Sequence, residues 1–444
     1  MKIPLAAVVL AFLAVLPARA QKPVREPVAR DLIEMMGKEE FPGAVSLFDA
    51  KMREVMPADT LRDLWAGLTA KAGRFEYPGP ARAESAGGSG SQTVRVLCVF
   101  EKGAFAAKVG VDGEGRISGL SFLPAAAPSL EEELRPMPAL FQERSATVGT
   151  GEWALPGTLT MPAVSGPVPA VVLVHGAGPY DRDERVGPNR PFRDLAWGLA
   201  SRGIAVLRYE KRTKEHARLL DPMKDRITAN EETVDDALAA VKLLRGIGGI
   251  NSKKIFVLGH GLGGMLAPRI ASRDPGIAGL IILAGMSRPL EDVILGQMTY
   301  ILSLNEGEAF AGDKAQLERI KGQAARVKDR SLSEKVPPTE LPLGIPASYW
   351  LDLRGYNPPE TAKKLNRPVL ILQGGRDYQA TAGDFEGWKK ALGSRANAQL
   401  RWYPRLNHQF VSGEGMSTPE EYLQRRRTVE GPVLDEIASW VGKQ

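Results

Sequence analysis

One short segment limits the possible folds of this chain more than any other. Residues 255–264 read Ile-Phe-Val-Leu-Gly-His-Gly-Leu-Gly-Gly, so an apolar strand-like run enters a glycine-rich turn. The stretch from Met265 to Ser272 that follows is typical of a helix. Glycine is needed where a turn is so tight that a side chain would collide with neighbouring backbone. The segment therefore predicts a strand, a sharp turn and a helix, a unit of folds built on a parallel sheet.

The spacing of these glycines is that of a nucleophile elbow, G-x-S-x-G, in which the serine hydroxyl is the attacking group. Gly259 and Gly263 occupy the outer positions, and Gly261 stands where the serine would be. We expect side chains at the two outer positions to strike neighbouring backbone. Gly261 keeps the turn and removes the hydroxyl.

The same segment also fits a second pattern. Gly259, Gly261 and Gly264 spell G-x-G-x-x-G, the fingerprint of a dinucleotide-binding turn. That fingerprint requires a carboxylate about 20 residues further on, at the end of the next strand. The next strand-like run, Ile277 to Leu283, is followed by Ala-Gly-Met instead. A dinucleotide-binding enzyme is therefore the weaker interpretation, and a purely structural glycine turn also stays open.

The first 20 residues have the layout of a secretory signal peptide. Lys2 precedes the apolar run from Ile3 to Leu16, and Ala-Arg-Ala follows before Gln21. This run is too short, and too interrupted by proline, for a helix that spans a bilayer, and no later segment is long and apolar enough for one. We expect residues 1–20 to be removed and the protein to be exported to the periplasm or the extracellular space.

Composition limits the partners that the chain can have. The formal net charge of +6 is spread along the 444 residues, so nucleic-acid binding has little support. The single cysteine, Cys98, cannot form an internal disulfide, and its apolar neighbours are typical of a small buried side chain. With 43% hydrophobic residues, the chain is long enough for two domains with sizeable cores. The sequence does not indicate an oligomeric state.

The chain divides into a small domain, a linker and a large domain. Residues 28–123 contain amphipathic helical stretches and then three strand-like runs, which predicts a small α+β domain. Residues 124–142 are rich in Pro, Ala and Glu, and we interpret them as a linker. Residues 143–444 alternate strands and helices, as in a mostly parallel sheet with helices on both faces. The alternation stops at about 287–365, which we interpret as a helical lid over the carboxyl ends of the strands.

Two residues that follow late strands are candidates for a catalytic triad. His408 comes after the last strand-like run, where a general base can accept a proton from the nucleophile. Asp377 follows the penultimate run, where a carboxylate can orient the imidazole. Its neighbour Arg376 is an alternative partner for this carboxylate. Asp384 and Asp352 are weaker candidates for the acid.

A glycine-containing loop after an early strand is a candidate oxyanion hole. The loop reads His175-Gly-Ala-Gly-Pro, and its glycines allow backbone N–H groups to approach an anionic oxygen closely. We expect the N–H donors to be those of Ala177 and Gly178, together with that of Leu262 directly after the elbow position. We expect His175 and His260 to brace these loops rather than to transfer protons.

Four motifs in this chain order together resemble the α/β-hydrolase superfamily. The motifs are His175-Gly-Ala-Gly-Pro, Gly259-His-Gly-Leu-Gly-Gly, Gln373-Gly-Gly-Arg-Asp and Leu406-Asn-His. The chain is most similar to the dienelactone-hydrolase and prolyl-oligopeptidase-like branch of exported esterases. The small first domain resembles an NTF2-like domain of unknown function that precedes the hydrolase in some exported bacterial proteins.

The resemblance implies acyl transfer through a serine, with a small-molecule ester or acyl substrate and no metal or organic cofactor. Because Gly261 replaces the serine, it implies a carboxylic-ester hydrolase by architecture that is inactive or strongly impaired. The alternative is a pseudoenzyme that binds an acyl or glycosyl ligand.

Overall fold

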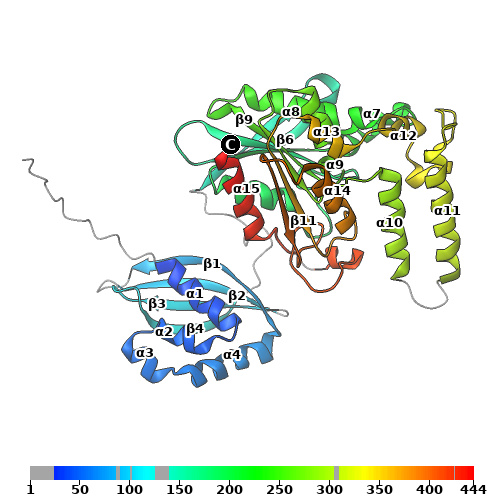
Figure 1. Ribbon diagram of the computed structural model, residues 1–444. Helices are drawn as coiled ribbons and strands as arrows, with labels where there is room; N and C mark the ends of the chain where they lie inside the picture. Colours follow the sequence, from blue (N-terminus) through cyan, green and yellow to red (C-terminus); the bar gives the residue numbers. More distant parts are fainter. Residues whose placement is uncertain (1–24, 87–90, 101–102, 126–139, 305–309, 425) are drawn as a thin grey trace, which may run out of the picture. The chain divides into compact units, whose positions relative to one another are not determined.

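A computed structural model of the chain describes residues 25–86, 91–100, 103–125, 140–304, 310–424 and 426–444 (Figure 1). The chain forms two compact units, residues 1–135 and residues 136–444. The predicted signal peptide, residues 1–20, lies outside the described residues, as does most of the predicted linker.

The smaller unit packs helices against a four-stranded antiparallel sheet in the order β1-β2-β3-β4. Its helices are α1 (Arg25–Gly37), α2 (Phe41–Ser46), α3 (Ala50–Val55) and α4 (Ala58–Ala72). Its strands are β1 (Phe75–Ala86), β2 (Gln92–Phe100), β3 (Gly103–Val111) and β4 (Ile117–Ala125). Trp65 of α4 joins the two layers, because its ring lies 4.9 Å from that of Phe75 and 5.4 Å from that of Phe100. Cys98 is fully buried in this core, and burial raises the pKa of its thiol to about 12.

Strand β1 was not among the three strands predicted for this unit. It contains two prolines and a glycine, at positions 78 to 80, which weaken the pattern of a strand. The structure accommodates them because β1 is an edge strand with irregular pairing to β2.

The larger unit is built on one eight-stranded sheet in the order β12-β11-β10-β9-β7-β8-β6-β5. The strands are β5 (Phe141–Val148), β6 (Leu155–Pro162), β7 (Val168–Val174), β8 (Ala205–Tyr209), β9 (Ile250–His260), β10 (Gly279–Leu283), β11 (Val369–Gly374) and β12 (Ala398–Tyr403). Strands β7 to β12 pair in parallel, and β6 pairs antiparallel to both β5 and β8. The predicted mostly parallel sheet is thus confirmed, with two antiparallel strands that the sequence analysis did not include.

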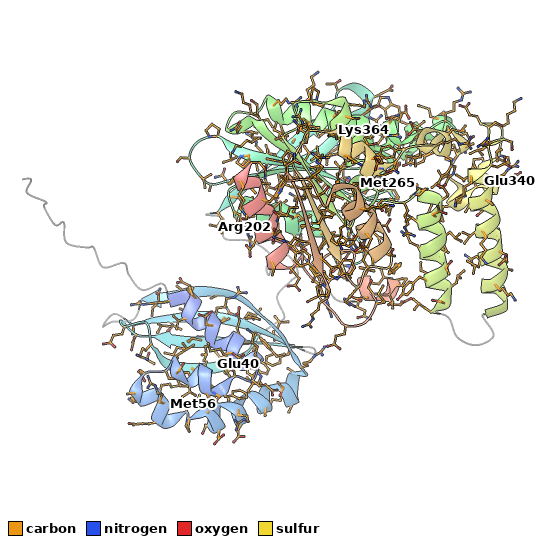
Figure 2. All side chains as sticks on the ribbon, viewed as in Figure 1. Glu40, Met56, Arg202, Met265, Glu340 and Lys364 are labelled. Atoms are coloured by element: carbon orange, nitrogen blue, oxygen red, sulfur yellow. The ribbon has the colours of Figure 1, made fainter. Side chains whose placement is uncertain are left out.

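Helices cover both faces of this sheet, as predicted. Helices α5 (Pro191–Ala200) and α15 (Gly431–Lys443) pack on one face, and α8 (Asp235–Arg245), α9 (Leu262–Arg273) and α14 (Ala382–Leu392) pack on the other. The alternation along β9 explains this, since Leu258 lies in the core with α5 and Val257 in the core with α8, and both are fully buried. Met265 of α9 is buried, whereas the charged side chain of Lys364 is exposed (Figure 2).

A helical insertion separates β10 from β11. It contains α10 (Leu290–Ser303), α11 (Phe310–Lys328), α12 (Ala347–Leu353) and α13 (Pro358–Lys364). Helices α10 and α11 lie side by side (Figure 1), while α13 packs on α9 and α14 and so belongs to the layer that covers the sheet. Among the described residues, no helix combines the length and the apolar character needed to cross a membrane.

Candidate active site

The turn between β9 and α9 has the geometry of a nucleophile elbow. Gly261 has φ 52° and ψ −114°, a conformation that L side chains rarely adopt. A Cβ at Gly259 would lie 2.2 Å from the carbonyl oxygen of Gly263, and a Cβ at Gly263 would lie 2.2 Å from that of Val174. The prediction that side chains at the two outer glycines would strike backbone is confirmed.

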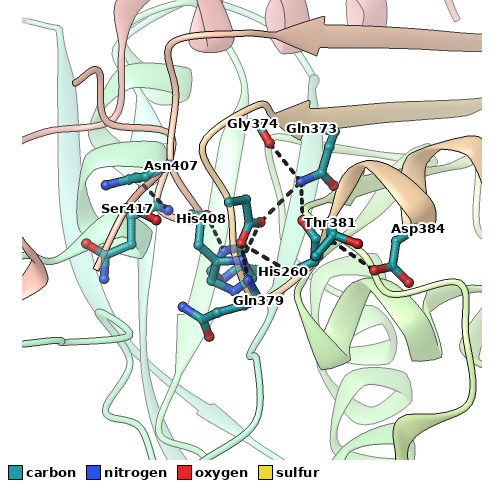
Figure 3. Close-up of polar contacts among 12 residues, drawn as sticks. His260, Gln373, Gly374, Gln379, Thr381, Asp384, Asn407, His408 and Ser417 are labelled. Atoms are coloured by element: carbon teal, nitrogen blue, oxygen red, sulfur yellow. Dashed lines mark hydrogen bonds and ion pairs between the residues drawn. The ribbon is translucent and has the colours of Figure 1, made fainter. Parts of the chain in front are cut away.

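His408 and Asp377 meet at the carboxyl end of the sheet. The Nδ1 atom of His408 lies 2.7 Å from Oδ2 of Asp377, and both side chains are buried (Figure 3). The other carboxylate oxygen, Oδ1, accepts hydrogen bonds from the backbone N–H groups of Gln379 at 2.7 Å and Ala380 at 3.1 Å. The carboxylate is therefore fixed in orientation and can hold the imidazole with Nε2 free to act.

The imidazole faces the elbow. A Cβ built on Gly261 lies 3.3 Å from Nε2 of His408 and 3.7 Å from Cα of Gly176 in the predicted oxyanion loop. The loop that carries His408 is shaped by Asn407, whose Oδ1 accepts hydrogen bonds from the N–H groups of Gln409 and Val411. The structure thus brings the three predicted triad positions together, with no side chain at the first of them.

The alternative acids and the alternative partner of Asp377 are engaged elsewhere. Arg376 forms an ion pair with Glu421 at 2.6 Å. Asp384 pairs with an arginine at 2.7 Å and caps α14. Asp352 pairs with Arg269 at 2.7 Å. Of the three aspartates considered, only Asp377 contacts His408 in the part of the chain that the structure describes.

A cavity of about 780 Å³ opens beside these residues. The predicted donors Ala177, Gly178 and Leu262 all line it, together with Gly261 and His408. The insertion contributes apolar side chains to its wall, and these include Leu290, Ile294, Leu343 and Ile345. The N–H of Leu262 is in the first turn of α9, where backbone donors have no partner within the helix. The site therefore combines N–H donors with a largely apolar wall, as a binding site for an acyl group requires.

His260 lies behind the triad in a buried ion pair. Its Nδ1 is 2.8 Å from Oε2 of Glu184, and its Nε2 lies 2.8 Å from the backbone oxygen of His408. Burial alone would lower the pKa of His260, but the Glu184 carboxylate, the contact with the backbone oxygen of His408 and the charge of Asp377 together raise that pKa above its ordinary value. His175 lies with its Nε2 3.0 Å from the backbone oxygen of Asp181, and burial lowers its pKa to about 4. Both histidines contact loop backbone, as expected of residues that brace the site.

Sequence reasoning missed two charged residues beside the oxyanion loop. Glu184 accepts a hydrogen bond from the N–H of Gly176 at 2.6 Å, and Lys211 donates one to the carbonyl oxygen of Gly176 at 2.8 Å. Both side chains are buried. They lie in irregular segments outside the recognised motifs, and only the tertiary contacts of each with Gly176 reveal them.

This fold and this arrangement of elbow, acid, histidine and glycine loop are those of the alpha/beta hydrolase family, to which the chain belongs. The profile of the alpha/beta hydrolase family matches residues 171–425. A second profile, described as protein of unknown function (DUF3887), matches residues 29–120 in the smaller unit.

The chain is similar to an esterase of Thermotoga maritima, EstD. The two are 38% identical over 415 residues, which cover 93% of this chain and 94% of the relative. Similar solved structures include Est1E from Butyrivibrio proteoclasticus, at 16% identity and a TM-score of 0.44, and a putative dienelactone hydrolase from Klebsiella pneumoniae, at 18% identity and a TM-score of 0.39. Each alignment covers 68% of this chain and 99% of the other.

Proposed function

We propose that the protein is an exported carboxylic-ester hydrolase by architecture whose catalysis is strongly impaired because Gly261 occupies the nucleophile position. The observation that carries the proposal is the 3.3 Å separation between a Cβ built on Gly261 and Nε2 of His408. A hydroxyl on that carbon would be within reach of the imidazole, as a serine nucleophile must be.

The geometry supports a complete acyl-transfer mechanism for a serine at this position. The imidazole of His408 would take the hydroxyl proton on Nε2, while Asp377 stabilises the resulting cation through Nδ1. The N–H groups of Ala177 and Leu262 would bind the oxyanion of the tetrahedral intermediate. The imidazolium would give its proton to the departing alcohol as the ester C–O bond breaks, which leaves an acyl-enzyme. Water deprotonated by the same imidazole would then attack the acyl group and release the acid and the free serine.

The described residues that line the cavity do not include a serine or a cysteine that could replace the nucleophile. Thr213 is the one aliphatic hydroxyl among these lining residues. Water held by Nε2 of His408 can attack an ester directly, by general-base catalysis without a covalent intermediate. Such a route retains only a small part of the rate enhancement of a triad.

The test compares ester hydrolysis by this chain and by Gly261→Ser. We expect short-chain aryl esters to be hydrolysed at least about 10³-fold faster by the serine variant, because loss of a triad serine removes on the order of 10⁶ in kcat. A serine-directed fluorophosphonate should label the variant and not the parent. Equal and substantial turnover by both forms would mean that another nucleophile operates.

The second candidate is a binding protein for an acyl-containing ligand. The cavity of about 780 Å³, lined by apolar side chains of the insertion, favours it. Inactivity of both forms, together with saturable binding of a fatty acid or ester, would support this role. A dinucleotide-binding turn has less support, because close packing against backbone accounts for Gly259 and Gly264 of that pattern without a ligand. Tight nicotinamide binding would restore that third candidate.

A further inference from the structure

The two backbone polar groups of Gly176 are both held by buried charges. Its N–H donates to the Glu184 carboxylate at 2.6 Å, and its carbonyl oxygen accepts from the Lys211 ammonium at 2.8 Å. Both residues are 2% exposed. Hydrogen bonds to charged groups are about twice as strong as those between neutral groups. The backbone at Gly176 is therefore held more firmly than an ordinary glycine loop.

The contact with Lys211 fixes the direction of an oxyanion donor. The carbonyl of Gly176 and the N–H of Ala177 belong to the same trans peptide group, so they point in opposite directions. Because Lys211 holds the carbonyl oxygen on its own side of the peptide group, the Ala177 N–H points away from Lys211. An ammonium on the oxygen also polarises the peptide group, which makes its N–H a better donor.

We propose that Lys211 is a positioning residue, which orients and polarises the Ala177 N–H as a donor to an anionic oxygen. The catalytic part of this inference rests on the proposed function, since an oxyanion forms only if an ester is attacked. We expect a carboxylate that binds to the Ala177 N–H to depend on Lys211 in the same way.

Lys211 is itself held by residues that reach the insertion. Its Nζ lies 2.8 Å from Oε1 of Glu232, in the π-helical turn Asn230–Val234. The other oxygen of Glu232 accepts a hydrogen bond from the Tyr349 hydroxyl of α12 at 2.6 Å. Burial and the Glu232 carboxylate raise the pKa of Tyr349 well above its ordinary value, so the phenol stays a donor. Both Glu232 and Tyr349 line the cavity.

The Glu232 carboxylate has a second consequence for Lys211. Because the two opposite charges lie 2.8 Å apart, the Glu232 carboxylate offsets part of the direct field of Lys211. We therefore expect Lys211 to act on an oxyanion mainly through its hydrogen bond to Gly176. Its loss should change the rate of the chemical step more than the binding of a neutral ester.

The first experiment uses the full chain with Gly261→Ser and measures kcat and KM for an aryl ester. We expect Lys211→Met to lower kcat 10- to 100-fold with KM within about threefold, because misplacing one oxyanion donor resembles its partial removal. Lys211→Arg, which keeps a charged donor, should recover part of kcat. The matched control is Lys214→Met, since Lys214 is only three residues away, half-exposed, and pairs with Glu210 instead.

The second experiment needs no serine and uses the chain with Gly261. Calorimetry compares the binding of hexanoate with that of hexanamide, which differs mainly in the charge of the head group. We expect the parent to prefer the anion and Lys211→Met to lose at least fivefold of that preference, whereas Lys214→Met keeps it. If Lys211→Met does not fold, Lys211→Gln replaces it in both experiments. We then expect intermediate losses of kcat and of anion preference, because a neutral donor replaces a charged one.

The outcomes separate this inference from the proposed function. An inactive Gly261→Ser protein in which Lys211→Met still reduces anion preference would overturn the function and keep the inference. The inference alone would be overturned if the Gly261→Ser protein is active and Lys211→Met has no larger effect than Lys214→Met on either kcat or anion preference.

Discussion

A serine at position 261 should destabilise the protein even though we expect it to supply the missing nucleophile. Gly261 has φ 52° and ψ −114°, and a residue with a side chain held in such a sparsely populated conformation costs on the order of 1–3 kcal/mol. The new Cβ would also lie 3.3 Å from Nε2 of His408, close enough that the imidazole must move slightly. We expect the hydrolase unit to lose about 1–3 kcal/mol of unfolding free energy. Its midpoint of thermal unfolding should fall by roughly 2–6 °C.

Scanning calorimetry of three proteins tests this reasoning. The parent is compared with Gly261→Ser and with Gly261→Ala, which adds the same Cβ without a hydroxyl. Both variants should unfold at a similar, lower temperature, and only the serine variant should hydrolyse an aryl ester. A serine variant as stable as the parent would refute the argument from backbone strain. Hydrolysis by the alanine variant at the rate of the serine variant would refute the assignment of the nucleophile.

Three further predictions concern the acid, the turn and pH. In the Gly261→Ser protein, Asp377→Asn should lower kcat by about 10⁴-fold in steady-state assays, because an amide favours the wrong imidazole tautomer; a loss below tenfold would point to another acid. Gly263→Ala should lower the free energy of unfolding, measured in urea, by at least about 2 kcal/mol, since its Cβ would lie 2.2 Å from a backbone oxygen. Gly322→Ala, which places a Cβ in open space on a helix, should instead raise that free energy by about 0.5–1 kcal/mol. Equal effects would contradict the packing argument. Because burial lowers the pKa of His175 to about 4, the unfolded chain binds more protons between about pH 6.5 and pH 4, and stability should fall as the pH drops through that window. His175→Asn should remove up to about 1.4 kcal/mol per pH unit from this slope, and an unchanged slope would exclude the histidine as its source.

The central parallel strands of the hydrolase unit were predictable because they contain short, buried apolar runs that lie between turns and helices. Buried strands such as β7 and β10 are apolar throughout, as expected where both faces of a sheet are covered. By contrast, β5 exposes most of its side chains, and β6 contains Pro156 and Gly157. The edge strand β5 and its neighbour β6 are recognisable only from their pairing partners, which the sequence does not reveal.

The triad positions of the candidate site were predictable from the sequence, whereas the buried charges beside the glycine loop were not. Gly261, Asp377 and His408 follow strands at positions that chain order identifies, and the fold brings them together. Glu184 and Lys211 were not predictable, because charged residues in irregular segments are ordinarily solvated. Both side chains are buried because they contact the backbone of Gly176 in the folded protein. Local sequence patterns do not indicate these tertiary contacts.

The close approach of Gly259 and Gly263 to surrounding backbone has a consequence for how such a protein can change over time. The sharp bend depends on those two positions, so the residue between them can be exchanged without rebuilding the scaffold. Serine and glycine codons can differ by a single base. On the proposed function, reactivity at this position is separable from architecture, and we expect one nucleotide substitution to silence or to supply it with only a small shift of His408 and local backbone strain.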